Sequence, residues 1–191
     1  MSIIDSLVTD RTAADVSRIE QLNKKGLAGM TEEELFYFLH GSPAPLIARD
    51  GPLEAYDGQL DIYDNIVKGD YRAADLNRVG AAMNYVADRL KAQGYDPHIN
   101  PKTDWKDDDW VDPAAQAVYL GDLAELRKQF AMLYSTPEVP PRILATGINT
   151  NDGLTHTWAN DIEKILEDID LLLTNSAQAW FYSGELFSGE V

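Results

Sequence analysis

Apolar residues recur every three or four positions in several stretches of the chain, which is the spacing of one face of an α-helix. These stretches lie at about 12–24, 31–40, 71–93, 112–134 and 157–174. The pattern is clearest in the third stretch, which contains Leu76, Val79, Met83, Val86 and Leu90. The chain is therefore predicted to be all-α, a helical bundle of about five helices in which the three long stretches form the main body.

Residues that begin and end helices stand at the borders of these stretches. Thr31 precedes a run of glutamates, which suits a helix start because a hydroxyl caps the first turn and acids favour the positive end of the helix dipole. Asp112 followed by Pro113 is a second start signal, a capping side chain and then a proline at the first helical position. Gly26 and Gly94 follow two of the stretches and are typical helix stops.

The segment 42–69 departs from the helical pattern because prolines and glycines interrupt it. It is either wholly irregular or contains a β-hairpin with strands near 46–49 and 59–63. Residues 1–10 are predicted to be a short leader. The expected organisation has four parts, an N-terminal helix pair at 1–41, the insertion at 42–69, the main bundle at 70–175 and a C-terminal docking tail at 176–191.

A short pattern recurs at three of the predicted helix starts, 12–19, 72–79 and 158–165. In each copy an aspartate follows small residues or Asn, an aliphatic residue comes next, and Arg or Lys stands three positions after the aspartate. An acid favours the positive end of the helix dipole, and a base one turn later is placed to pair with it. The pattern predicts helix-start ion pairs between Asp15 and Arg18, Asp75 and Arg78, and Asp161 and Lys164.

The C-terminal residues are unusually rich in aromatic and large aliphatic side chains. They include Trp180, Phe181, Tyr182, Leu186 and Phe187. An apolar segment of this size is unfavourable in water. It is therefore expected either to fold back on its own chain or to dock on a neighbouring protein.

The charge of the chain narrows the classes of partner. Its 32 Asp and Glu outnumber its 16 Lys and Arg, and the formal net charge is −16. Such a surface repels phosphates, so neither nucleic acid nor an anionic membrane is expected as a partner. No run of about 18 apolar residues that would predict a membrane span is present. The first residues lack the pattern of a signal peptide, which predicts synthesis in a cytoplasm.

Few residues of the chain are candidates for catalytic or metal-binding chemistry. The sequence contains no cysteine, which excludes disulfides, zinc–thiolate sites and cysteine nucleophiles. His40, His98 and His156 do not have the spacing of a metal-ligand motif, and the acidic run 107–109 lacks the ligand order of a calcium loop. We expect no enzyme activity and no cofactor, although a hydrolase with paired carboxylates is an alternative that spacing alone leaves open.

The sequence at 71–80, Tyr-Arg-Ala-Ala-Asp-Leu-Asn-Arg-Val-Gly, resembles a helix start of small tail and baseplate-region proteins of Firmicutes phages and prophages. Their pattern is aromatic-x-x-x-Asp-Leu-Asn-Arg-Val/Ile-Glu, and this chain has Gly80 at the position of the Glu. The resemblance covers most of the chain outside about 42–69, including 9–16, 101–105, 159–166 and 180–185. It implies a virion structural protein without catalytic residues.

We therefore expect a structural protein of a phage tail, in the baseplate, tail tip or fibre attachment, made in the host cytoplasm and located in the virion. The resemblance implies protein–protein assembly with other tail proteins, and a homo-oligomer is expected because a symmetric tail holds several copies of each part. The alternative is a host-surface module for glycan binding. In that case Trp105 and Trp110 would form a loop that contacts cell-wall sugars or another partner.

Overall fold

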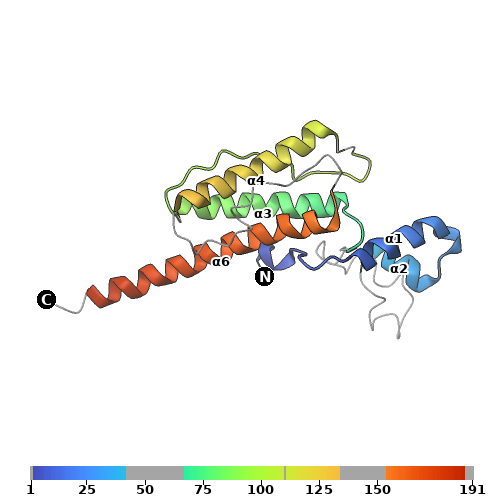
Figure 1. Ribbon diagram of the computed structural model, residues 1–191, viewed down its shortest axis with the longest axis horizontal. Helices are drawn as coiled ribbons and strands as arrows, with labels where there is room; N and C mark the ends of the chain where they lie inside the picture. The colour runs from blue at the N-terminus through green and yellow to red at the C-terminus, as the bar shows by residue number, and fades with distance from the viewer. Residues whose placement is uncertain (1, 42–66, 110, 134–153, 188–191) are drawn as a thin grey trace.

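The computed structural model describes residues 2–41, 67–109, 111–133 and 154–187 (Figure 1). Its α-helices are α1 (Ala13–Lys25), α2 (Glu32–His40), α3 (Ala73–Ala92), α4 (Pro113–Leu133) and α6 (His156–Phe187), and its 3-10 helices are η1 (Ile3–Ser6) and η2 (Leu27–Gly29). The described ranges contain no strand, so the prediction of an all-α protein is confirmed. The predicted strands near 46–49 and 59–63 lie outside the described residues.

The starts of α1 and α2 follow from their sequences. Thr12 and Thr31 precede the first turns, and their hydroxyls accept the backbone N–H groups of Asp15 and Glu34 at 3.3 and 3.2 Å. In return, each carboxylate accepts the backbone N–H of the capping threonine, at 2.8 Å in both helices. These reciprocal bonds form two capping boxes, so both helix starts were determined locally.

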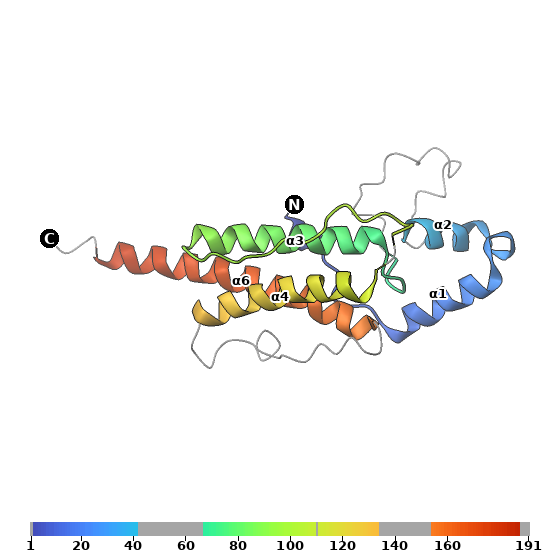
Figure 2. The ribbon, with the colours of Figure 1, turned by 90° about the horizontal axis from the view of Figure 1, so that it is seen from above.

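The three long helices α3, α4 and α6 run in the same direction (Figure 1, Figure 2). Their first turns meet at the end of the bundle that carries α1 and α2, which we call the helix-start end. The hydroxyls of Tyr71, just before α3, and Tyr119 of α4 lie 2.9 Å apart there. Because α3 and α4 are parallel, the segment that joins them must return along the bundle. It begins near Tyr95, whose backbone N–H donates to the Leu90 carbonyl at 3.1 Å, and it reaches Trp105, whose carbonyl accepts a hydrogen bond from the Asn77 side chain.

The main core lies between α3, α4 and α6, and η1 closes one side of it. Its fully buried side chains include Met83 and Leu90 of α3, Leu123 and Leu126 of α4, and Ile162, Leu166, Ile169 and Leu173 of α6. Ile4 of η1 is 8% exposed and belongs to the same core. The prediction that residues 1–10 are a short leader is therefore wrong, because burial of Ile4 fixes this segment to the bundle.

Helices α1 and α2 pack around a second, smaller core. Ile19, Leu22, Tyr37 and Val67 are its buried members. The guanidinium of Arg18 lies 3.8 Å from the centre of the Tyr37 ring, a cation–π contact on the edge of this core. The predicted helix pair thus has its own apolar contacts and lies beside the helix-start end (Figure 1).

Helix α6 is longer than its apolar pattern predicted. The helix expected to end near 174 continues to Phe187, so most of the predicted tail is helical. At 1.5 Å per residue, its 32 residues span about 48 Å, whereas the 20 residues of α3 span about 30 Å. Arg89, near the end of α3, donates to the Asp170 carboxylate and to the Thr174 hydroxyl. Beyond this level α6 extends past the ends of α3 and α4 (Figure 1, Figure 2).

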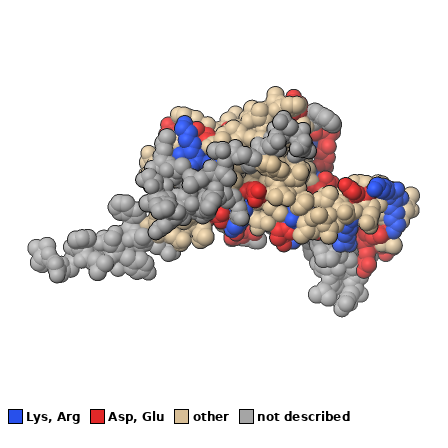
Figure 3. Space-filling model, in the orientation of Figure 1, with Lys and Arg blue, Asp and Glu red and all other residues tan. Residues whose placement is uncertain are grey.

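The described surface is charged unevenly. On the face in Figure 3, charged side chains of both signs gather toward the end that carries α1 and α2, whereas much of the described surface over α4 is uncharged. Val118 of α4 is 57% exposed and Leu171 of α6 is 54% exposed. Among the described residues, no helix is both long enough and apolar enough to cross a membrane.

Gly80 allows the returning segment to cross α3 at short range. A Cβ atom at this position would lie 2.7 Å from the carbonyl oxygen of Lys102 and 3.1 Å from Cγ2 of Thr103. One turn earlier, the Asn77 side chain accepts the backbone N–H of Trp105 at 2.7 Å and donates to its carbonyl at 2.9 Å. This packing explains why this position of α3 is glycine.

Replacing Gly80 by alanine is expected to lower the free energy of unfolding by about 1–3 kcal/mol, because overpacking against the Lys102 backbone outweighs the better helix propensity of alanine. Gly121 of α4 is the matched control, since a Cβ there would meet nothing within 4 Å. Gly121→Ala is expected to raise the same free energy by about 0.5–1 kcal/mol. Urea unfolding followed by circular dichroism measures both, and a stabilising Gly80→Ala would contradict the close crossing.

Candidate functional site

Four charged side chains are buried together at the helix-start end. Arg11, Asp75, Arg78 and Glu163 are 4%, 1%, 6% and 0% exposed, and we call them the charge cluster. Nη2 of Arg11 lies 3.0 Å from Asp75 Oδ1 and 2.7 Å from Glu163 Oε1. Nη2 of Arg78 lies 2.5 and 3.5 Å from the same two oxygens. Two positive and two negative side chains thus compensate one another out of contact with water.

Backbone groups take up further bonds of the charge cluster. Glu163 accepts the N–H of Val8 at 2.6 Å, and Arg11 donates to the Val8 carbonyl at 2.6 Å. Asp75 accepts the N–H of Arg72 at 3.0 Å. Asn160 of α6 bonds with both backbone groups of Arg11, at 2.9 and 2.8 Å. The cluster therefore ties the segment between η1 and α1 to the first turns of α3 and to α6.

Burial and charge act against each other on the ionisation of these groups. Burial raises the pKa of Glu163, although Arg11 and Arg78 act to lower it. Burial acts to lower the pKa of Arg78, but Asp75 and Glu163 outweigh it and the pKa lies above its ordinary value. Glu163 thus depends on both arginines to remain ionised, which suits a cluster that holds elements together better than one that transfers protons.

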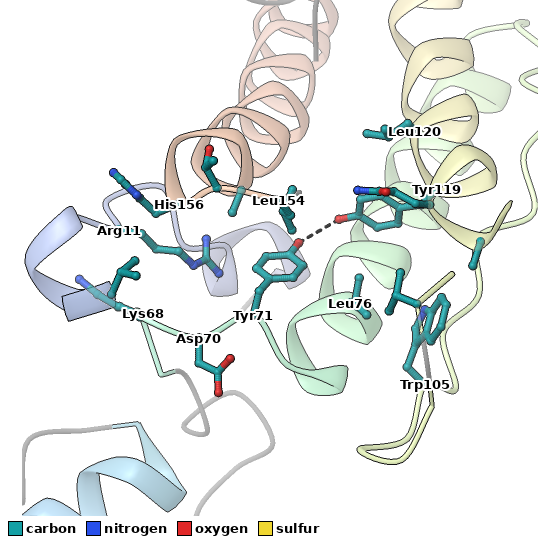
Figure 4. Close-up of a pocket in the computed structure, with 17 residues that line it drawn as sticks. Arg11, Lys68, Asp70, Tyr71, Leu76, Trp105, Tyr119, Leu120, Leu154 and His156 are labelled. Carbon is teal, nitrogen blue, oxygen red and sulfur yellow. Dashed lines mark hydrogen bonds between the residues drawn. The ribbon is translucent and has the colours of Figure 1, made fainter. Parts of the chain in front are cut away.

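A pocket of about 650 Å³ adjoins the charge cluster at the helix-start end (Figure 4). We call it the helix-start pocket. Its aromatic and aliphatic walls include Tyr71, Leu76, Trp105, Tyr119, Leu120 and Leu154, and its polar lining includes Arg11, Lys68, Asp70, Gln116 and His156. Burial raises the pKa of both tyrosines, so their hydroxyls stay protonated at neutral pH. Nε1 of Trp105 is buried and has no hydrogen-bond partner among the described residues.

The second copy of the repeated pattern forms the predicted ion pair, Asp75 with Arg78, inside the charge cluster. The first copy is arranged differently. Asp15 accepts the hydroxyl of Thr12 at 2.7 Å, while Arg18 stacks on Tyr37 in the smaller core. Arg18 thus contacts an aromatic ring at an exposed helix start, whereas Arg78 is bonded to carboxylates at a buried one.

The third copy does not stand at a helix start, because α6 begins at His156 and Asp161 lies in its second turn. Lys164 bonds with carboxylates farther along the helix, Glu167 at 2.6 Å and Asp168 at 2.9 Å. The repeated pattern therefore corresponds to three different local arrangements. The second copy contributes its own Asp–Arg pair to the charge cluster, and the third contributes Glu163.

The predicted glycan or partner loop has one described member, because Trp110 lies outside the described residues. Trp105 is 9% exposed and forms a wall of the pocket, so it is not an open platform for a sugar. The residues Trp180, Phe181, Tyr182, Leu186 and Phe187 belong to the last turns of α6. No group of three or more His, Asp or Glu in the described ranges is placed to hold a metal ion.

Arg11 and Glu163 were missed by the analysis of the sequence. Glu163 had a detectable signal, since it interrupts the apolar stripe of α6 between Ile162 and Ile165. A charged residue within such a stripe indicates a buried ion pair, but its partner cannot be named from spacing. Arg11 had no such signal, because it lies between the predicted leader and the first predicted helix and interrupts no apolar stripe.

No protein-family model matches this chain, and neither the curated proteins nor the solved structures provide a match. The function must therefore be inferred from the arrangement of its own residues.

Proposed function

We propose that this chain is a virion structural protein of a bacteriophage tail, in the baseplate, tail tip or fibre attachment. It acts by protein–protein assembly with other tail proteins and with further copies of itself. On this proposal it is made in the host cytoplasm, resides in the virion and catalyses no reaction. The sequence resemblance to small tail and baseplate-region proteins supports the phage assignment.

The observation that carries the assembly role is the extension of α6 beyond the bundle (Figure 1). The last turns of this helix contain Trp180, Phe181, Tyr182, Leu186 and Phe187. A helix within a protein gains most of its stability from packing of its apolar face against other elements. A protruding helix end rich in aromatic residues is therefore expected to be covered by a partner.

The charge cluster and Trp105 favour assembly over the two alternatives. Both carboxylates of the cluster are bonded to arginines and to backbone N–H groups, which leaves a hydrolase no free pair of acids at this site. Trp105 is buried, whereas a glycan-binding module needs aromatic faces open to the sugar. The alternative of a host-surface module is therefore the weaker one.

Ending the chain after Asn175 tests the proposal in the phage that encodes it. Leu173, the last core residue in the part of the chain whose burial is described, is retained, so the bundle is expected to keep its helix content. Incorporation into purified particles, measured by quantitative mass spectrometry, is expected to fall at least about tenfold, which corresponds to about 1.4 kcal/mol of lost binding free energy. A chain that ends after Phe187 is the matched control. Normal incorporation of the shorter chain would refute the role of the protruding helix, and absence of the full chain from particles would refute the phage assignment.

A further inference from the structure

We infer that the helix-start pocket binds the protruding end of α6, residues 177–187, of a second copy of this chain. The contact is head to tail, between the helix-start end of one copy and the C-terminal end of the next. This inference rests on the proposed function and deepens it, because it names the partner and the site of assembly.

The two surfaces lie at opposite ends of one continuous helix. His156 and Ala159 of α6 line the helix-start pocket, and Trp180 follows His156 by 24 positions. At 1.5 Å per residue this separates them by about 36 Å along the helix axis. The end of α6 therefore cannot reach the pocket of its own chain. A contact between two different surfaces of one protein continues from copy to copy and builds a ring or a filament.

The chemistry of the pocket matches that of the segment. Residues 177–187 contain one glutamate and neither lysine nor arginine, and their large side chains are mostly aromatic. The pocket presents aromatic and aliphatic walls together with Lys68, Asp70 and His156, and Lys68 is paired with Asp10 at 2.6 Å. The first turns of α3, α4 and α6 also direct the positive ends of their dipoles toward this end. The two surfaces match chiefly in their aromatic and aliphatic side chains.

The size of the pocket defines how the segment enters. A volume of about 650 Å³ lies within the usual range of ligand pockets and is too small for a complete helix. Large side chains of the segment therefore enter as anchors, while the helix itself stays outside. Aromatic anchors in a desolvated pocket are the usual centre of a protein–protein contact.

Sedimentation velocity of the full chain over a range of concentrations tests the inference. Gln116→Trp fills the pocket from its α4 wall, and Val118→Trp, at a 57% exposed position of the same helix that does not line the pocket, is the matched control. The natural chain and Val118→Trp are expected to self-associate, whereas Gln116→Trp is expected to raise the dissociation constant at least about tenfold. A natural chain that is monomeric throughout, or equal association of both variants, would overturn the inference. If Gln116→Trp loses its helix content, Ala115→Leu fills the same wall with a smaller side chain.

A mixing experiment tests the direction of the contact. The full-length double variant Trp180→Glu with Phe187→Glu retains the pocket, and Gln116→Trp retains the helix end. Each is expected to be monomeric alone, and an equimolar mixture is expected to form dimers and nothing larger. A mixture that stays monomeric overturns the head-to-tail contact even if the truncation above removes the chain from particles. Dimers in the mixture, with the full chain absent from particles, leave the contact standing and refute the phage assignment.

Discussion

Arg78→Met is expected to lower the free energy of unfolding by about 3–5 kcal/mol at neutral pH, because it leaves the buried carboxylates of Asp75 and Glu163 with one arginine between them. The methionine keeps much of the side-chain volume, so the effect reports the charge. Urea unfolding followed by circular dichroism measures it. Lys164→Met is the control, because Lys164 is 33% exposed and pairs with the solvated Glu167, and ion pairs at the surface contribute at most about 1 kcal/mol.

A second substitution separates charge from packing. Adding Glu163→Gln to Arg78→Met returns the charge cluster to one cation and one anion, Arg11 and Asp75, which remain 3.0 Å apart. The double variant is therefore expected to be more stable than Arg78→Met alone. A double variant whose loss equals the sum of the two single losses would show that the four charges do not act as a unit.

The loss in Arg78→Met is expected to shrink as the pH falls. Burial already raises the pKa of Glu163 above its ordinary value of 4.5, and removal of Arg78 raises it further. Between the ordinary value and the raised pKa, the folded variant binds a proton that the unfolded chain lacks, so its stability increases as the pH is lowered through this window. Unfolding curves at several pH values check the sign, and a loss that grows on acidification would contradict it.

Leu166→Ala is expected to lower the free energy of unfolding by about 2–5 kcal/mol, because Leu166 is fully buried between α6 and α3 and its truncation leaves a cavity. Leu171 of the same helix is 54% exposed and serves as the matched control. Leu171→Ala is expected to change the free energy by no more than about 0.5 kcal/mol. Thermal and urea unfolding measure both variants. Similar losses at the two positions would show that α6 does not bury the face described above.

Helix positions could be predicted because their signals are local. The steps of three and four residues from Leu76 to Leu90 and the capping threonines before α1 and α2 act within one or two turns. The end of α6 was placed too early because the aliphatic stripe stops near 173, although nothing in the following residues breaks a helix except Gly184. A change in side-chain type was mistaken for a change in backbone conformation.

The sequence by itself determined that there are five helices, where α1 and α2 are capped and which side of α3 is buried, since these depend on neighbours within a few residues. Only the tertiary structure decided that α3, α4 and α6 are parallel, that η1 belongs to the core, and that Val8 bonds with Glu163 across 155 positions. Periodicity shows which face of a helix is apolar but not which element covers it. The charge cluster and the pocket arise from the meeting of three helix starts, which no local pattern encodes.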